Sequence, residues 1–384
     1  MGLVSRRQLL KGGAAALGAA GLAGGGRLVW PQEAGARPVR RCVSLGANGV
    51  INPGSTQDYR SCRHFLLDTG TRWVRIWADW PSLQPEARLA PDRGSGAWRV
   101  SELDDQIARA RSDGIGVILT AYRFPTWSNG TAQLPDRLYP LQDRRFKLPP
   151  DVDLGGDWAR WIEFLIERYG ESIVALEPVN EPNAQVWPLY APSGELTIHR
   201  VVARMFQTAQ AIAAAHPPAP LLLGPTTSDT VASSRLSVPF HVFTRALLDE
   251  LDRIGFEPGR RFAWAHHNYS DVEHDRASGA AMVHRLLSGR WAGWPNADAA
   301  NPAILIPEGG ARLTKIARLY PNADPQRLQA TLIQRNWTRM SKQPGIAMLG
   351  QYLFYSDPTF DCGLCDTDGT RRPAYRAWAG LPSA

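Results

Sequence analysis

The chain has 384 residues, of which 44% are hydrophobic and 21% are charged. This composition is typical of a folded globular protein and excludes disordered and fibrous chains. The formal net charge is +7, but residues 1–36 hold four of the 43 basic residues and one of the 36 acidic residues, so the charge is only +4 without them. No Lys/Arg cluster remains in the rest of the chain, and we therefore expect no nucleic-acid partner.

The N-terminal segment resembles a twin-arginine export signal. Arg6 and Arg7 precede Lys11 and a weakly apolar run over residues 12–26, in which seven of the 15 residues are glycine. A membrane-spanning helix needs about 20 mostly apolar residues, so we expect no membrane association once the signal is removed. Residues 34–36 have the small-x-small form of a cleavage site. The segment predicts a signal over 1–36 and a secreted or extracytoplasmic mature protein beginning at Arg37.

Four cysteines, Cys42, Cys62, Cys362 and Cys365, lie in the mature chain. Disulfides persist outside the cytoplasm, and four cysteines allow three pairings. The close spacing of Cys362 and Cys365 makes a local bridge between them the easiest, which leaves Cys42 and Cys62 as the candidate second pair. Histidines at zinc-finger spacing and a thioredoxin-like context are both absent from the sequence, so we expect neither a metal site nor a redox motif.

Beyond the signal, short apolar runs alternate eight times with longer stretches, most of them of helical period. The predicted strands are 42–47, 73–78, 116–121, 173–179, 220–224, 262–267, 303–307 and 346–354. The helical stretches between them include 101–112, 158–169, 197–215, 242–254, 280–287 and 325–342. Eight such alternations predict an α/β fold of the (β/α)8 TIM-barrel type, with a single catalytic domain over 37–384. We expect a monomer.

The stretch 158–169 illustrates the helical pattern. Its apolar residues fall at i, i+3, i+4, i+7 and i+8, which gives one stripe to pack against a ring of strands; they are Trp158, Trp161, Ile162, Leu165 and Ile166. In contrast, residues 82–99 and 124–154 are rich in Pro, Gly and Asp and follow strand ends. We expect them to form long loops over the face of the barrel where active sites lie.

The densest site motif is Glu177-Pro-Val-Asn-Glu-Pro-Asn183, which directly follows an apolar run. In this motif, Asn180 and Glu181 stand beside each other at the C-terminal end of the predicted fourth strand. Proline fixes φ and removes a donor, so Pro178 and Pro182 favour a rigid exit from a strand over a helix interior. A carboxylate beside an amide at this position indicates catalysis, whereas a plain loop Glu with a structural Asn is the simpler alternative.

A second carboxylate, Glu308, ends the predicted seventh strand and precedes two glycines. Alone it is weak evidence. As a pair, Glu181 and Glu308 are more informative, because cleavage of a glycosidic bond needs one carboxyl held protonated and another held ionised across the sugar.

These motifs resemble those of the clan A glycoside hydrolases, which include the cellulase-like family 5 and the family 39 xylosidases. The resemblance covers the chain after the signal, through strand order as well as motifs. It implies that Glu181, which follows Asn180 on the fourth strand, is the general acid/base, and that Glu308 on the seventh strand is the nucleophile. No cofactor and no metal are implied.

Other segments carry the resemblance further. Residues 73–77 are similar to the second-strand segment of the clan, in which an arginine, here Arg75, lies beside the nucleophile. The Pro-Thr-Trp turn with Trp127 resembles family 39, and His267-Asn-Tyr269 resembles the sixth strand of family 5. The eighth strand departs from the pattern, because it offers Tyr352, with Phe354 as the alternative, where much of the clan has a tryptophan under the sugar.

The resemblance also implies roles for these residues. Arg75 and Tyr269 would hydrogen-bond Glu308 and keep it ionised, since an adjacent cation and donors favour the charged form. Asn180 would bind the sugar 2-hydroxyl, a contact that strengthens in the transition state. His267 would line the same subsite, with a structural histidine as its alternative. The rings of Trp127 and Tyr352 would stack on sugar faces, although Trp127 fits loop packing almost as well.

The sequence therefore predicts an exported, retaining hydrolase of β-glycosides that acts on an oligosaccharide or polysaccharide. Three alternatives use the same fold. A carbohydrate-binding barrel without catalysis is disfavoured by the presence of both carboxylates, and a transglycosylase would use the same residues. A metal-dependent hydrolase would need His266 and His267 together, although adjacent strand residues point to opposite faces.

The export hypothesis predicts that replacing Arg6 and Arg7 by lysine traps the precursor in the cytoplasm of a suitable host, because the paired arginines are what the twin-arginine pathway recognises. Immunoblots of cytoplasmic and exported fractions measure this. Normal export of the double variant would refute the assignment.

Overall fold

The computed structural model describes residues 39–46, 57–86, 100–132, 149–184, 194, 196–234, 237–258, 261–290 and 303–382. These residues belong to the compact unit Ala36–Ala384. The expected signal over 1–36 lies outside the described residues. Among the described helices, none is long and apolar enough to cross a membrane.

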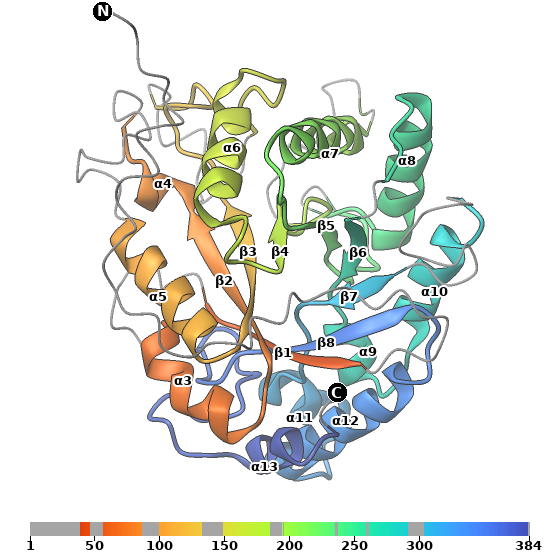
Figure 1. Ribbon diagram of the computed structural model, residues 1–384. Helices are drawn as coiled ribbons and strands as arrows, with labels where there is room; N and C mark the ends of the chain where they lie inside the picture. The colour runs from red at the N-terminus through yellow and green to blue at the C-terminus, as the bar shows by residue number, and fades with distance from the viewer. Residues whose placement is uncertain are drawn as a thin grey trace, which may run out of the picture. The chain divides into compact units, whose positions relative to one another are not determined.

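Eight parallel strands close into a barrel in the order β1 to β8, and helices surround it (Figure 1). The strands are β1 (Arg40–Ser44), β2 (Trp73–Asp79), β3 (Gly116–Tyr122), β4 (Ala175–Glu177), β5 (Leu221–Thr227), β6 (Phe262–His266), β7 (Ile304–Ile306) and β8 (Ile346–Tyr352). Each overlaps a predicted strand, and the predicted (β/α)8 TIM-barrel fold is confirmed.

Helices follow the strands along the chain. They are α3 (Tyr59–Asp68), α4 (Trp80–Leu83), α5 (Val100–Ser112), α6 (Asp157–Tyr169), α7 (Ile198–Ala215), α8 (Phe240–Arg253), α9 (Tyr269–Glu273), α10 (Ser278–Leu287), α11 (Leu313–Leu319), α12 (Pro325–Met340) and α13 (Pro373–Ala379). The six predicted helices correspond to α5, α6, α7, α8, α10 and α12. Of the two predicted long loops, residues 87–99 and 133–148 lie outside the described residues, and the first loop begins with part of α4.

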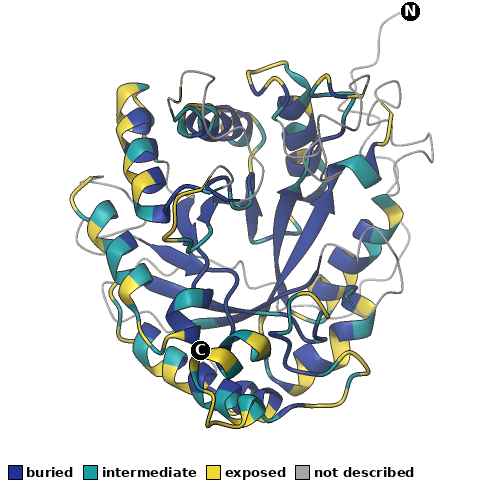
Figure 2. Ribbon diagram, turned by 180° about the vertical axis from the view of Figure 1, so that it is seen from behind, coloured by how far each residue is buried: buried dark blue, intermediate teal, exposed yellow. Residues whose placement is uncertain are grey.

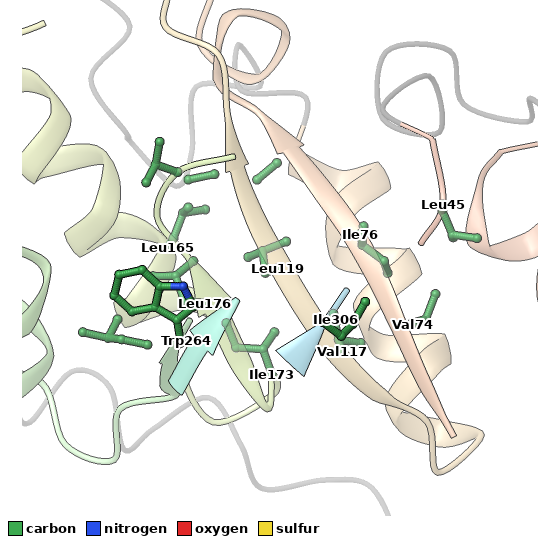
Figure 3. Packing of buried hydrophobic residues seen from close by; sticks show 14 of the residues in the cluster. Leu45, Val74, Ile76, Val117, Leu119, Leu165, Ile173, Leu176, Trp264 and Ile306 are labelled. Carbon is green, nitrogen blue, oxygen red and sulfur yellow. The ribbon is translucent and has the colours of Figure 1, made fainter. Parts of the chain in front are cut away.

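The main core lies between the strands and the helices. On β2 and β3, Val74, Ile76, Val117 and Leu119 point outward into this layer, where Leu165 of α6 also lies (Figure 3). The apolar stripe of α6 is buried while its outer face is exposed, as the dark blue inner faces in Figure 2 show for the helices generally. Because side chains alternate along a strand, the intervening residue Arg75 points into the barrel.

The four cysteines are all free and buried, so neither predicted disulfide is formed. Cys42 faces the barrel interior, close to the charges of Arg75, Glu177 and Glu308, and Cys62 lies on α3 in the core outside the strands. Cys362 donates instead to the carbonyl oxygen of Tyr352 at 2.5 Å. Cys42 and Cys62 thus lie on opposite sides of the strand layer, which their spacing along the chain does not reveal.

Candidate active site

One end of the barrel gathers the polar side chains that follow the strands. Since all eight strands are parallel, their C-terminal ends meet at one face. Seven of the eight predicted site residues form one connected group there, namely Arg75, Asn180, Glu181, His267, Tyr269, Glu308 and Tyr352.

Arg75 is the centre of this group and is completely buried. Its Nε donates to Glu177 Oε2 at 2.7 Å, and its Nη2 donates to Asn180 Oδ1 at 2.9 Å. Its Nη1 donates to Glu308 Oε1 and, at 3.2 Å, to Ser44 Oγ. Burial alone would lower the pKa of Arg75, but the charges of the two carboxylates outweigh it and raise that pKa. The guanidinium is therefore a permanent cation among these groups.

Glu308 lies just beyond β7 and is 6% exposed. Besides the bond from Arg75, its Oε2 accepts a hydrogen bond from the Tyr269 hydroxyl at 2.7 Å. Burial, and then the charge of Glu308, raises the pKa of Tyr269 well above its usual range. The tyrosine thus stays a donor, and Glu308 is held by a cation and a hydroxyl, as the resemblance implies.

Glu181 leaves β4 with a φ of 46°, in the left-handed region that residues other than glycine rarely adopt. Its backbone N–H donates to Thr226 O of β5 at 2.8 Å, which anchors the turn. The turn brings its Oε1 to 2.8 Å from His267 Nδ1, and 19% of the side chain is exposed. Strained backbone of this kind concentrates at functional sites, where the surrounding structure fixes it.

His267 connects the two carboxylates. Its Nδ1 lies 2.8 Å from Glu181 Oε1 and 3.6 Å from Glu308 Oε2, and the side chain is fully buried. Burial would lower the pKa of His267, but the Glu308 charge and the hydrogen bond to Glu181 raise it above the ordinary value. The imidazole is therefore within reach of both carboxylates, and they favour its protonated form.

The neighbouring His266 lies on the opposite face of β6. Its Nδ1 is 2.9 Å from Thr227 Oγ1, and its ring lies 4.8 Å from that of Phe240. Burial, with the nearby His267, lowers the pKa of His266 to about 3, so it is neutral at ordinary pH. The two histidines cannot bind one ion as the metal-dependent alternative requires. Among the described residues, metal-ligand spacing occurs at Glu163, Glu167 and His216, on α6 and at the end of α7.

Aromatic rings border Glu308 on the side of β8. The ring of Tyr352, which is partly exposed, lies 6.3 Å from that of Tyr269. Phe360, on the segment after β8, lies 5.0 Å from Tyr269 and 5.5 Å from Tyr352. Trp127 lies elsewhere, because its Nε1 donates to Gln84 O at 3.1 Å and its ring packs on Trp80. Its contacts are those of the loop-packing alternative, and its stacking on sugar stays a prediction.

Two polar residues near the group, Glu177 and Asp229, were not assigned roles from the sequence. Glu177 points into the barrel, where Thr120 Oγ1 donates to its Oε2 at 2.7 Å. Asp229, beyond β5, accepts from Ser270 N. Burial raises the pKa of Asp229 to about 7, although the hydrogen bond from Ser270 lowers it. The nearby charge of Glu181 also raises this pKa. Glu177 carried a signal, a charged residue inside an apolar strand, whereas Asp229 sits in an unremarkable Ser/Thr segment.

No protein-family model and no curated protein matches the chain. Solved structures do. A family 39 glycoside hydrolase from the gut symbiont Bacteroides cellulosilyticus WH2 is 13% identical with a TM-score of 0.56, and the match covers 90% of this chain but only 63% of that one. The chain thus spans less than two thirds of that protein.

Two further structures are matched over nearly their whole length. Fungal β-1,4-galactanases are 11% identical with a TM-score of 0.58, over 89% of this chain and 99% of theirs. XacCel5A, solved in complex with cellopentaose, is 16% identical with a TM-score of 0.53, over 88% and 98%. The fold is shared with these enzymes. The expected resemblance to clan A glycoside hydrolases is therefore confirmed at the level of the fold.

The opposite environments of the two adjacent histidines predict different titrations. In histidine-labelled protein followed by NMR, His266 stays neutral down to about pH 4, whereas His267 titrates above the usual histidine range. Glu181→Gln lowers the His267 midpoint, because it removes one of the charges that favour the imidazolium. A His267 midpoint unchanged by Glu181→Gln would contradict the coupling.

Proposed function

We propose that the chain is an exported glycoside hydrolase that cleaves β-linked O-glycosidic bonds by double displacement with net retention. The observation that carries the proposal is that two carboxylates, Glu181 and Glu308, lie close to the same imidazole but have different surroundings. Glu308 is bonded by Arg75 and Tyr269, while Glu181 is partly exposed and bonded to His267. Paired acids in unlike environments are what acid and nucleophile roles require.

The spacing of the pair supports retention. Because one nitrogen of His267 lies 2.8 Å from Glu181 Oε1 and 3.6 Å from Glu308 Oε2, these oxygens can be no farther apart than the two distances combined. That limit applies to one pair of oxygens. Retaining enzymes hold their carboxyl groups about 5 to 5.5 Å apart and inverting enzymes about 6.5 to 9.5 Å apart, so a shared contact with one imidazole nitrogen favours the closer arrangement.

In the first step, an oxygen of Glu308 bonds to the anomeric carbon while the bond to the leaving oxygen breaks. The proton of Glu181 passes to that oxygen. In the second step, Glu181 takes a proton from water, whose oxygen bonds to the anomeric carbon and releases the Glu308 carboxylate. His267 would hold Glu181 in position through both steps. With its Oδ1 bonded to Arg75, Asn180 would present its amide N–H groups to the sugar 2-hydroxyl.

The substrate class is inferred from the aromatic ring beside Glu308 and from the solved structures that the chain matches. The partly exposed ring of Tyr352 beside Glu308 suits the apolar face of a sugar. The matched structures include galactanases and a protein bound to cellopentaose, which favours an oligo- or polysaccharide here too. In this proposal the mature chain over 37–384 acts as a monomeric single domain outside the cytoplasm, without cofactor or metal.

Site variants test the two roles on a panel of polysaccharides and aryl glycosides. Glu308→Gln lowers kcat/KM by roughly 10⁴ or more on every substrate, because no covalent step remains. Glu181→Ala lowers it by roughly 10² to 10⁴ on poor leaving groups only, since activated aryl groups leave without a proton. Added azide partly restores breakdown of the intermediate in this variant.

Glu163→Gln is the matched control, because Glu163 is a half-exposed carboxylate on α6 that is hydrogen-bonded to a histidine as Glu181 is. It should retain wild-type turnover. Activity that survives in Glu308→Gln, or an absence of turnover by the wild-type protein on the whole panel, would contradict the proposal.

A further inference from the structure

The barrel interior holds a second carboxylate below the site, which the two displacement steps do not use. Glu177 ends β4 and is completely buried. Both of its hydrogen bonds fall on one oxygen: Arg75 Nε and Thr120 Oγ1 each lie 2.7 Å from Oε2. The other oxygen, Oε1, has no hydrogen-bond partner among the described residues. A neutral glutamine would accept the same two bonds, so what distinguishes Glu177 is its charge.

That charge is close to Arg75, the guanidinium that is hydrogen-bonded to Glu308. Arg75 bonds Glu177 through Nε and Glu308 through Nη1, so a single positive charge lies between two carboxylates in a fully buried setting. Water screens little at such depth, and each carboxylate weakens the attraction of the guanidinium for the other. Other titratable groups near Glu308 come from β1, the turn after β4, the residue after β6, α9, β8 and the segment after β8; they are Cys42, Glu181, His267, Tyr269, Tyr352 and Cys362.

We propose that Glu177 is a positioning residue that acts through Arg75, and that its negative charge limits how strongly Arg75 stabilises the ionised form of Glu308. The inference rests on the proposed role of Glu308 as the nucleophile. A carboxylate held too firmly by a cation is a weaker base and a weaker nucleophile, because the same attraction must be overcome when its oxygen bonds to carbon. In this inference Arg75 favours the ionised form of Glu308, and Glu177 keeps that carboxylate reactive by weakening the hold of Arg75.

The direct test is a carboxyl titration that needs no substrate. In purified protein labelled with ¹³C at the glutamate carboxyls, the Glu308 resonance is assigned by its loss in Glu308→Gln. In Glu177→Gln, the titration midpoint of this resonance falls by about one pH unit. The reason is that the negative charge of Glu177 no longer offsets the attraction of Arg75 for ionised Glu308. An unchanged midpoint, or a rise, overturns the inference.

Two variants separate charge from structure. Thr120→Val removes one hydrogen bond from Glu177 but keeps the charge, and Glu177→Asp keeps the charge on a shorter side chain. Both leave the Glu308 midpoint near its wild-type value, whereas a purely structural role would make them shift it as Glu177→Gln does. If Glu177→Gln does not fold, Glu177→Asp decides, since it keeps the charge and must leave the Glu308 midpoint near its wild-type value. A clearly shifted midpoint in Glu177→Asp overturns the inference.

Kinetics then connect the charge to the reaction. The acidic limb of the kcat/KM profile of Glu177→Gln moves to lower pH, and its rate of glycosylation falls roughly threefold to tenfold. If the wild-type protein hydrolyses no glycoside, the proposed function fails while the titration still tests the charge coupling. If the wild-type protein is active but the acidic limb of the kcat/KM profile does not move in Glu177→Gln, only the inference fails.

Discussion

The buried guanidinium of Arg75 is the interaction on which the rest of the site depends. It ties together four strands through Ser44 of β1, Glu177 and Asn180 at β4, and Glu308 after β7. A cation at this depth is tolerated only when paired and hydrogen-bonded, and removing one partner of such a pair typically costs about 3 to 5 kcal/mol. The same contacts that make the arginine stable therefore fix the carboxylate that it faces.

The barrel supplies the place for this cation. Strand alternation turns Val74 and Ile76 outward to the helices and Arg75 inward, and parallel pairing brings the ends of β4, β6 and β7 to the same face. The turn after β4 then aims Glu181 at His267 through a backbone conformation that Thr226 of the next strand holds. The segments directly after β4 and β7 thus position the two carboxylates, while the aromatic rings come from α9, β8 and the segment after β8.

Much of this was predictable from the sequence because it depends on local pattern. Apolar runs ending in Glu181 and Glu308 give the strands and their termini directly. Contacts between distant segments, such as those of Arg75 and Tyr269 with Glu308, were predictable only through the resemblance, and other such contacts were not predictable. The cysteine pairing is wrong because chain spacing says nothing about which side of a barrel wall a thiol faces. Phe360 escaped notice because its segment has neither strand nor helix period, and the role of Glu177 appears only when Arg75 is seen between two acids.

The central claim is that Glu308 attacks the sugar while Glu181 handles the proton. The most direct measurement is the configuration of the first product, followed by ¹H NMR from the start of hydrolysis of a β-glycoside. The account predicts that the β-anomer forms first and reaches the equilibrium mixture later by mutarotation. An α-anomer as the first product would contradict it, because a water molecule and not Glu308 would then have attacked the anomeric carbon.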